Sequence, residues 1–306
     1  MLLKFSDNPF QAAYGIVRYN WKAIAWFIVM SSIAWLLFTY YKIDITLPGV
    51  PVSIMGGGLA FFLAFRNNSA YDRWWEARKI WGGVVNVSRS FAMEVCTLIR
   101  GESSDRVKTG LVYRHLAWIN ALRIQLRKQD HWEDLSPFLE AAEKEELLGK
   151  RNKATQLIHR QGHEIAKAKD AGRLSEFEEI KLMESLKEMY DLQGKAERIK
   201  NTVFPFYYLY FTKLFLWVFV IMLPCALVEP IGWVAIPVSV IINFVFYILD
   251  KSGIISEDPF EGRAADTPMS TLCRTIEIDL REQLGEKNIP ETAEISYTKY
   301  KAAFYD

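Results

Sequence analysis

The sequence predicts an all-α membrane protein whose chain carries four transmembrane helices and a helical cytoplasmic domain. Four nearly uncharged stretches of roughly twenty residues stand in two pairs, one toward each end of the chain. The segment between the pairs is rich in charged residues, has helical periodicity and lacks the alternation of strands. The net charge of +1 over 306 residues argues against a nucleic-acid-binding protein.

The first pair of apolar stretches covers residues 23–65. Residues 23–41 are uncharged and have a lysine on each side, a pattern typical of a helix that reaches both membrane interfaces. Residues 45–65 are also uncharged, although two prolines and three consecutive glycines weaken their helical propensity. We therefore expect a transmembrane hairpin over 23–65, preceded by a cytoplasmic segment over 1–22.

The second pair lies within residues 203–249. The stretches 214–228 and 231–249 hold no charge and are separated by only two residues. Lys213 precedes the first of them, and it must extend toward the headgroups, pair with an opposite charge or line water, because a charge within the bilayer is costly. Residues 250–306 are then predicted to form a C-terminal cytoplasmic segment.

The distribution of basic residues predicts the orientation. The N-terminal flank carries Lys4, Arg18 and Lys22 against Asp7, whereas the turns within the two hairpins carry little positive charge. The positive-inside rule therefore places both termini and residues 66–202 in the cytoplasm. The alternative, core helices of a large soluble protein, is the weaker one because it requires four such apolar stretches in one core.

The cytoplasmic domain over 66–202 is expected to consist of long helices. The expected helices cover residues 76–100, 105–129, 133–169 and 174–200, and a loop over 252–270 is expected to lead into a short helix at 270–285. In the helix at 174–200, apolar residues recur every three positions and predict one apolar stripe on a charged helix. The residues of this stripe are Leu174, Phe177, Ile180, Met183 and Leu186.

The sequence contains no catalytic constellation, so we do not expect an enzyme. The glycines 56–58 lack the Lys-Ser/Thr that completes a phosphate-binding loop. His159 and His163 have the spacing of two zinc ligands on a helix, but no third ligand is indicated, which favours a solvated helix face. The three cysteines fit no disulfide or metal pattern. We expect neither a metal nor a cofactor.

Residues 64–83 mark the place where the second span leaves the membrane. If its helix continues, Gly57, Phe61 and Phe65 share one face at four-residue intervals. Apolar rings from several subunits around one axis would form a constriction that gates by dewetting. Packing against neighbouring helices explains the same face equally well.

The polar half of this segment has helical pairing of its own. Arg73 and Glu76 are spaced for an ion pair. Trp74, Arg78 and Trp81 share a face on which a guanidinium can stack on indole. We therefore expect the helix of the second span to become the first cytoplasmic helix.

At this segment the sequence resembles the bestrophin family in its bacterial form. The motif SAYDRWWEARKIWG, directly after a second apolar span, is similar to the family signature. Residues 196–224 resemble the segment that enters the third span of the family, and SEDPFEG at 256–262 resembles its Asn-Pro-Phe-Gly segment. The signature residues are Arg73, Trp74, Trp75 and Glu76.

The resemblance implies a homopentameric ion channel around one central pore in the bacterial plasma membrane. In the family, apolar side chains one helical turn apart on the second span form a narrow neck, and the corresponding residues here are Gly57, Phe61 and Phe65. Familiar members have an apolar side chain at the first position, so Gly57 implies a wider outer mouth.

A second, cytosolic aperture is implied on a helix that precedes the third span. Counting back from Pro205 gives Phe177, with Ile180 one turn further on, and both remain candidates.

The resemblance also bears on calcium. Animal members have an acidic run after Asn-Pro-Phe that helps to build a calcium clasp. Here the corresponding stretch holds only Glu261 and Asp266, and Asp258 replaces the asparagine. Because calcium takes about six or more oxygen ligands, we predict no calcium activation.

One further observation bears on whether the permeant ion is a cation or an anion. Animal members conduct chloride, whereas bacterial relatives are described as passing monovalent cations. Residues 174–191 carry six acidic side chains against two lysines, and fivefold repetition of this excess would build an acidic vestibule. We therefore expect sodium and potassium to permeate, with an anion channel as the alternative. A membrane-anchored scaffold or signalling protein is the alternative from another class.

Overall fold

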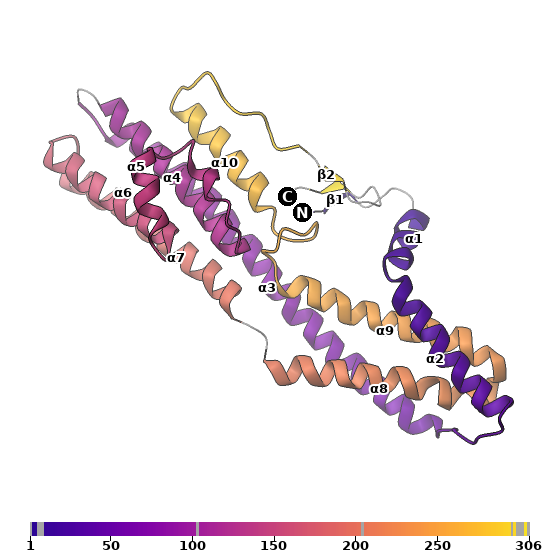
Figure 1. The fold of residues 1–306 in the computed structure, drawn as a ribbon. Coiled ribbons are helices and arrows are strands. Elements are labelled where there is room, and N and C mark those ends of the chain that lie inside the picture. The colour runs from indigo at the N-terminus through magenta and orange to yellow at the C-terminus, as the bar shows by residue number, and fades with distance from the viewer. Residues whose placement is uncertain are drawn as a thin grey trace.

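The computed structural model describes residues 2–4, 9–101, 104–202, 205–294, 296–297 and 303–304. Its helices form an elongated molecule with a bundle toward each end (Figure 1). One bundle holds the apolar stretches, and the other holds the charged middle of the chain.

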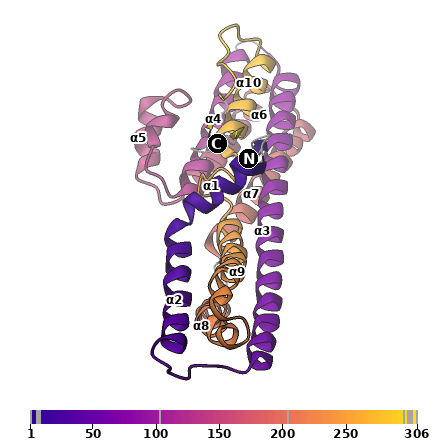
Figure 2. The ribbon, with the colours of Figure 1, turned by 90° about the vertical axis from the view of Figure 1, so that its right-hand side faces the viewer.

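The longest helix, α3, covers Gly49–Leu98 and takes part in both bundles (Figure 2). Its 50 residues correspond to a length of about 75 Å. The predicted helices at 45–65 and 76–100 are thus parts of one helix, since no proline interrupts the segment between them. The proposed domain boundary at residue 66 lies inside this helix.

The apolar bundle consists of α2 (Trp21–Thr39), the first half of α3, α8 (Phe206–Ile231) and α9 (Ala235–Glu257). A short 3₁₀ turn, η2 (Gly232–Val234), reverses the chain so that α8 and α9 run side by side in opposite directions (Figure 1). Large apolar side chains from α2, α3 and α8 fill the centre of this bundle. They include Phe27, Leu59, Leu63, Leu216 and Phe219.

By length and composition, three helical segments of the described chain can cross a membrane. They are Trp21–Thr39, Gly49–Leu98 and Phe206–Glu257. The third contains both α8 and α9, so the four predicted apolar stretches lie in four helices. Lys213 has an exposed side chain about two turns from the start of α8, a position from which its stem can extend toward an interface.

The second bundle combines the far half of α3 with four other helices. These are α4 (Ser104–Arg127), α6 (Lys153–Asp170), α7 (Glu176–Asn201) and α10 (Met269–Gln283). Of these, α4, α7 and α10 pack against α3, and α6 packs against α4 and α7. Its centre is fully buried and contains Trp81, Phe91 and Trp118. The helices predicted at 105–129, 174–200 and 270–285 therefore form close to their expected limits.

The prediction of one helix over 133–169 is wrong. The structure has a 3₁₀ turn, η1 (Trp132–Leu135), followed by the helices α5 (Ala141–Leu148) and α6. Pro137 separates η1 from α5, because proline lacks the amide that a continuing helix needs. Asn152 begins α6 anew, since its side chain accepts a hydrogen bond from the amide of Thr155 at 3.0 Å.

The start of α7 has a local cause, and the end of α9 differs from the expected position. A capping box starts α7, in which the Ser175 hydroxyl accepts from the Glu178 amide and the Glu178 carboxylate accepts from the Ser175 amide at 2.8 Å. The loop expected from residue 252 begins later, because α9 continues to Glu257.

The chain ends add elements that the helical prediction did not include. A helix, α1 (Pro9–Tyr19), precedes α2. A small antiparallel sheet joins the two termini in the order β1–β3–β2, with β1 at Leu2–Lys4, β2 at Ser296–Tyr297 and β3 at Ala303–Phe304.

Candidate functional site

The predicted neck residues lie on an exposed face of α3. Phe61 and Phe65 are 62% and 54% exposed, and Gly57 on the same face is also exposed. The two phenyl rings meet edge to face with their centroids 4.5 Å apart. The structure thus brings Phe61 and Phe65 together in an apolar surface that none of the other helices in the described residues covers.

The opposite face of α3 explains why these rings point outward. Leu59 and Leu63 are buried in the apolar bundle. A Cβ atom at Gly56 would come within 2.9 Å of the Phe219 ring of α8, so α3 and α8 approach too closely for a side chain there. This packing fixes the rotation of α3 and leaves the face of Gly57, Phe61 and Phe65 free.

The candidates for the cytosolic aperture lie in the first two turns of α7. Phe177 is 85% exposed and Ile180 is 51% exposed. The single apolar stripe predicted on this helix is wrong, because Leu174 and Leu186 are buried in the core. A spacing of three residues drifts by about 60° per step around a helix with 3.6 residues per turn, so the series passes from the core across the surface and back into the core.

Arg73 of the signature motif joins three helices. Its Nε donates to the carbonyl oxygen of Glu257 at 3.1 Å, at the end of α9. Its Nη1 and Nη2 donate to the carbonyls of Thr202 and Ile199 at 2.7 and 2.8 Å, at the end of α7. Helix C-termini have carbonyls without intrahelical partners and carry partial negative charge, so one guanidinium stabilises both ends.

The other signature residues surround this junction. The Trp74 indole donates to the Ala265 carbonyl at 2.8 Å and stacks on the Trp75 ring at 6.1 Å between centroids. Glu76, which its spacing placed beside Arg73, forms an ion pair with Lys79 at 2.7 Å. The motif thus holds the loop after α9 against α3.

Arg66 forms a buried ion-pair network that the sequence did not predict. This side chain follows Phe65 directly and is only 3% exposed. Its Nη1 lies 2.6 Å from Oδ1 of Asp250, and its Nη2 lies 3.4 Å from Oε2 of Glu257. The sequence contained one signal, since Arg66 and Asp250 are each the first charged residue after an apolar run.

Two acidic side chains in the loop after α9, Glu261 and Asp266, already have protein partners. Glu261 forms an ion pair with Lys200, and this hydrogen bond lowers the pKa of the Glu261 carboxyl. The Asp266 carboxylate accepts from the amides of Glu261 and Arg263 at 2.9 and 3.0 Å, while burial raises the pKa of Asp266. Both carboxylates that the sequence offered for calcium therefore already have protein partners.

The acidic excess predicted on α7 is smaller at its surface. Glu178 and Glu179 are half-buried and pair with Arg100 and Lys169, each at 3.4 Å. The exposed charged side chains from the start of α7 to its last turn comprise four acids and four bases. The acids are Glu176, Glu184, Glu188 and Asp191, and the bases are Lys181, Lys187, Lys195 and Arg198.

The predicted histidine pair lies on the surface of α6. The Nε2 atoms of His159 and His163 are 3.1 Å apart, and both side chains are exposed. Within the described part of the chain, no group of three or more His, Cys, Asp or Glu side chains is placed to hold a metal ion.

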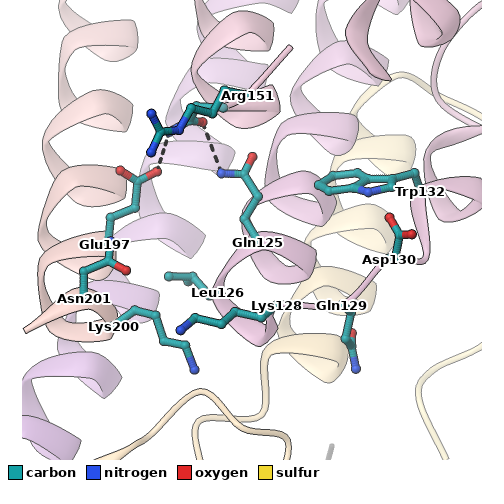
Figure 3. Close-up of a pocket in the computed structure, with 11 residues that line it drawn as sticks. Gln125, Leu126, Lys128, Gln129, Asp130, Trp132, Arg151, Glu197, Lys200 and Asn201 are labelled. Atoms are coloured by element: carbon teal, nitrogen blue, oxygen red, sulfur yellow. Dashed lines mark hydrogen bonds between the residues drawn. The ribbon is translucent and has the colours of Figure 1, made fainter. Parts of the chain in front are cut away.

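A polar cavity of about 500 Å³ lies between the ends of α4 and α7 and the start of α6 (Figure 3). Asn152 receives a hydrogen bond from Gln125 at 3.1 Å and donates one to Glu197 at 2.9 Å across its wall. Lysine and arginine side chains stand beside acidic ones in its lining. The side chains of Gln125, Asn152 and Glu197 thus satisfy one another in this wall.

Comparison with known proteins places these features in one family. The family model described as Bacterial/Fungal Bestrophin protein matches residues 12–282. A voltage-dependent anion channel-forming protein of Mesorhizobium japonicum is 33% identical over 85% of this chain and 83% of its own length. The voltage-dependent anion channel-forming protein YneE of Escherichia coli K12 is also 33% identical, over 86% of each chain. The crystal structure of a bacterial bestrophin homologue from Klebsiella pneumoniae superposes with a TM-score of 0.82 at 30% identity, covering 87% of this chain and 98% of that one.

Proposed function

The chain belongs to the bacterial bestrophin family and is a multi-pass membrane protein of the channel type, not an enzyme; from this premise we propose that five copies surround a pore whose neck is lined by Phe61 and Phe65. The observation that carries the proposal is the exposed phenylalanine pair on α3. A buried ion pair at the next residue, Arg66, anchors this helix to α9. Rings of phenyl groups around an axis would make a narrow, apolar passage.

The second constriction of the proposed pore is at Phe177. Of the two candidates on α7, Phe177 is the more exposed, at 85% against 51% for Ile180. Gly57 has no neighbouring atom within 4 Å of the place where a Cβ would stand, which supports a wide outer mouth above Phe61. Both termini and the second bundle are proposed to lie in the cytoplasm, as the positive-inside rule predicts.

We propose that the permeant ions are monovalent anions. The relatives from Mesorhizobium japonicum and Escherichia coli are named as anion channel-forming proteins. The expectation of sodium and potassium rested on an acidic α7, and the exposed side chains of that helix balance in charge. Monovalent cations remain the second candidate because the part of α7 up to Asp191 still holds four exposed acids against two exposed lysines.

We propose further that calcium does not activate the channel. The carboxylates of Glu261 and Asp266 are engaged by Lys200 and by two backbone amides. A calcium ion would have to displace these partners and still find about four more oxygen ligands.

The experiment is a reversal-potential measurement on purified protein in planar bilayers under a potassium chloride gradient. We expect reversal close to the chloride equilibrium potential. The double variant Phe61→Ala/Phe65→Ala should raise the conductance several-fold, because it removes the phenyl rings from the neck.

A matched control is available on α8. Phe211 and Phe215 are also exposed phenylalanines one turn apart, with ring centroids 6.2 Å from each other. The variant Phe211→Ala/Phe215→Ala should leave conductance and reversal potential unchanged. Reversal near the potassium potential would replace the anion by the cation proposal, and absence of current from an assembled oligomer would contradict the pore and favour the scaffold alternative.

A further inference from the structure

The elbow between α1 and α2 forms a groove, and we propose that this groove binds an anionic phospholipid. The phosphate would lie beside Arg18, and one acyl chain would lie along α2. The groove has a volume of about 390 Å³. Its lining includes Tyr14, Val17, Arg18, Trp21, Ile24 and Ile28.

The elbow is held in place by α9. Asn20 lies between the two helices and is only 6% exposed. Its amide donates to the Ile16 carbonyl at 2.8 Å and accepts from the Lys251 ammonium at 2.7 Å. The same ammonium lies 4.4 Å from the centre of the Tyr19 ring. Because α9 fixes the angle between α1 and α2, the groove is a preformed feature of the subunit.

The charge of the elbow selects an anion. Residues 9–43 contain no acidic residue, whereas Arg18 and Lys22 are both basic and exposed. The Arg18 guanidinium donates to the Tyr14 hydroxyl at 3.3 Å, which directs it along the groove. A phosphate in the groove meets the Arg18 guanidinium and the Tyr14 phenol, and the described residues that line the groove include no carboxylate.

The apolar wall identifies the anion as a lipid. Trp21 and Ile28 are 60% and 45% exposed, and they continue from the groove into the exposed apolar face of α2. That helix is one of the segments that can cross a membrane. Tryptophan and basic side chains at the end of such a helix are typical of the headgroup level, so a lipid can place its phosphate at Arg18 and its chain against Ile24 and Ile28.

Native mass spectrometry of the detergent-solubilised protein with equimolar phosphatidylglycerol and phosphatidylcholine tests this proposal. We expect preferential binding of phosphatidylglycerol. Arg18→Gln should weaken that binding about fivefold, the contribution of one basic residue near an anionic membrane surface. Arg18→Lys should retain most of it. The control Lys42→Gln removes a charge beyond the other end of α2 and should have no effect. Equal binding of the two lipids, or an Arg18→Gln variant that keeps the preference, would overturn the proposal.

A second measurement does not depend on the folding of the Arg18 variant. Phosphatidylglycerol with brominated acyl chains should quench the fluorescence of Trp21, so Trp21→Phe should reduce the quenched fraction relative to the unmodified protein. Unchanged quenching in Trp21→Phe would mean that the groove binds no lipid or is covered by another copy of the chain. Either result would also overturn the proposal.

Discussion

Arg66 and Arg73 stand two turns apart on α3 and are satisfied in different ways. Arg66 is buried and meets the carboxylates of Asp250 and Glu257. Arg73 donates to carbonyls at the ends of α7 and α9. Both contacts hold α3 immediately beyond Phe65, so the orientation of the proposed neck depends on two residues that do not line it.

At the residue scale, Asp250→Ala should destabilise the protein strongly. Removing this carboxylate leaves Arg66 buried with only Glu257 at 3.4 Å, and breaking a buried ion pair costs about 3–5 kcal/mol. Because Glu257 still compensates part of the charge, we expect a loss of about 3 kcal/mol in the free energy of unfolding. Denaturant unfolding in detergent micelles measures it.

The control for this variant is Lys79→Gln. Lys79 pairs with Glu76 at 2.7 Å, but its side chain is 58% exposed. Exposed pairs contribute about 0–1 kcal/mol, so the free energy of unfolding should hardly change. Equal losses in the two variants would show that the Arg66 network does not stabilise the protein.

At the element scale, the crossing of α3 and α9 is unusually close. Gly253 of α9 is buried against α3, and a Cβ there would come within 2.7 Å of Oδ1 of Asn67. The Asn67 amide is held in turn by the Leu249 carbonyl at 3.1 Å, so it cannot move without losing a hydrogen bond. A glycine at this position lets the two helices meet beside the Arg66 network.

Gly253→Ala should therefore lower the free energy of unfolding by about 1–3 kcal/mol, the usual cost of overpacking a filled interior. The matched control is Gly194→Ala on α7, where the new methyl group meets nothing within 4 Å. That variant should raise stability by about 0.5–1 kcal/mol, because alanine suits a helix better than glycine. Denaturant unfolding measures both variants. If Gly253→Ala raised the free energy of unfolding as Gly194→Ala is expected to do, the close crossing would be refuted.

At the scale of the whole molecule, α3 connects the apolar bundle to the charged one. A single helix that carries Phe61 and Phe65 at one end and the core residues Trp81 and Phe91 at the other couples the proposed pore rigidly to the second bundle. Assembly around an axis would bring the exposed face of α3 from each copy together.

This arrangement predicts the result of thiol crosslinking. In a background in which Cys96, Cys225 and Cys273 are replaced by alanine, Phe65→Cys should crosslink neighbouring subunits with a short bis-thiol reagent. Ile33→Cys, on the exposed face of α2, should give monomers on a denaturing gel. An intact oligomer that fails to crosslink at residue 65 would place the axis elsewhere.

Local patterns in the sequence determined much of this protein. Uncharged stretches predicted the helices of the apolar bundle, because a bilayer core requires about twenty apolar residues per helix. Ser175 and Glu178 start α7 close to the predicted position, and the signature around Arg73 identified the family. These signals act within a few residues of one another, so the order of residues alone contains them.

Only the tertiary structure decided which groups meet over long distances. Arg66 and Asp250 are separated by 184 residues, and their contact depends on how α3 and α9 cross. The same holds for Arg73 at the ends of two other helices and for the carboxylates of α7 that turn out to be paired. The physical reason is that a periodicity specifies which face of a helix is apolar, whereas its rotation and its neighbours follow from close packing, such as that of Gly56 on Phe219 and Gly253 on Asn67.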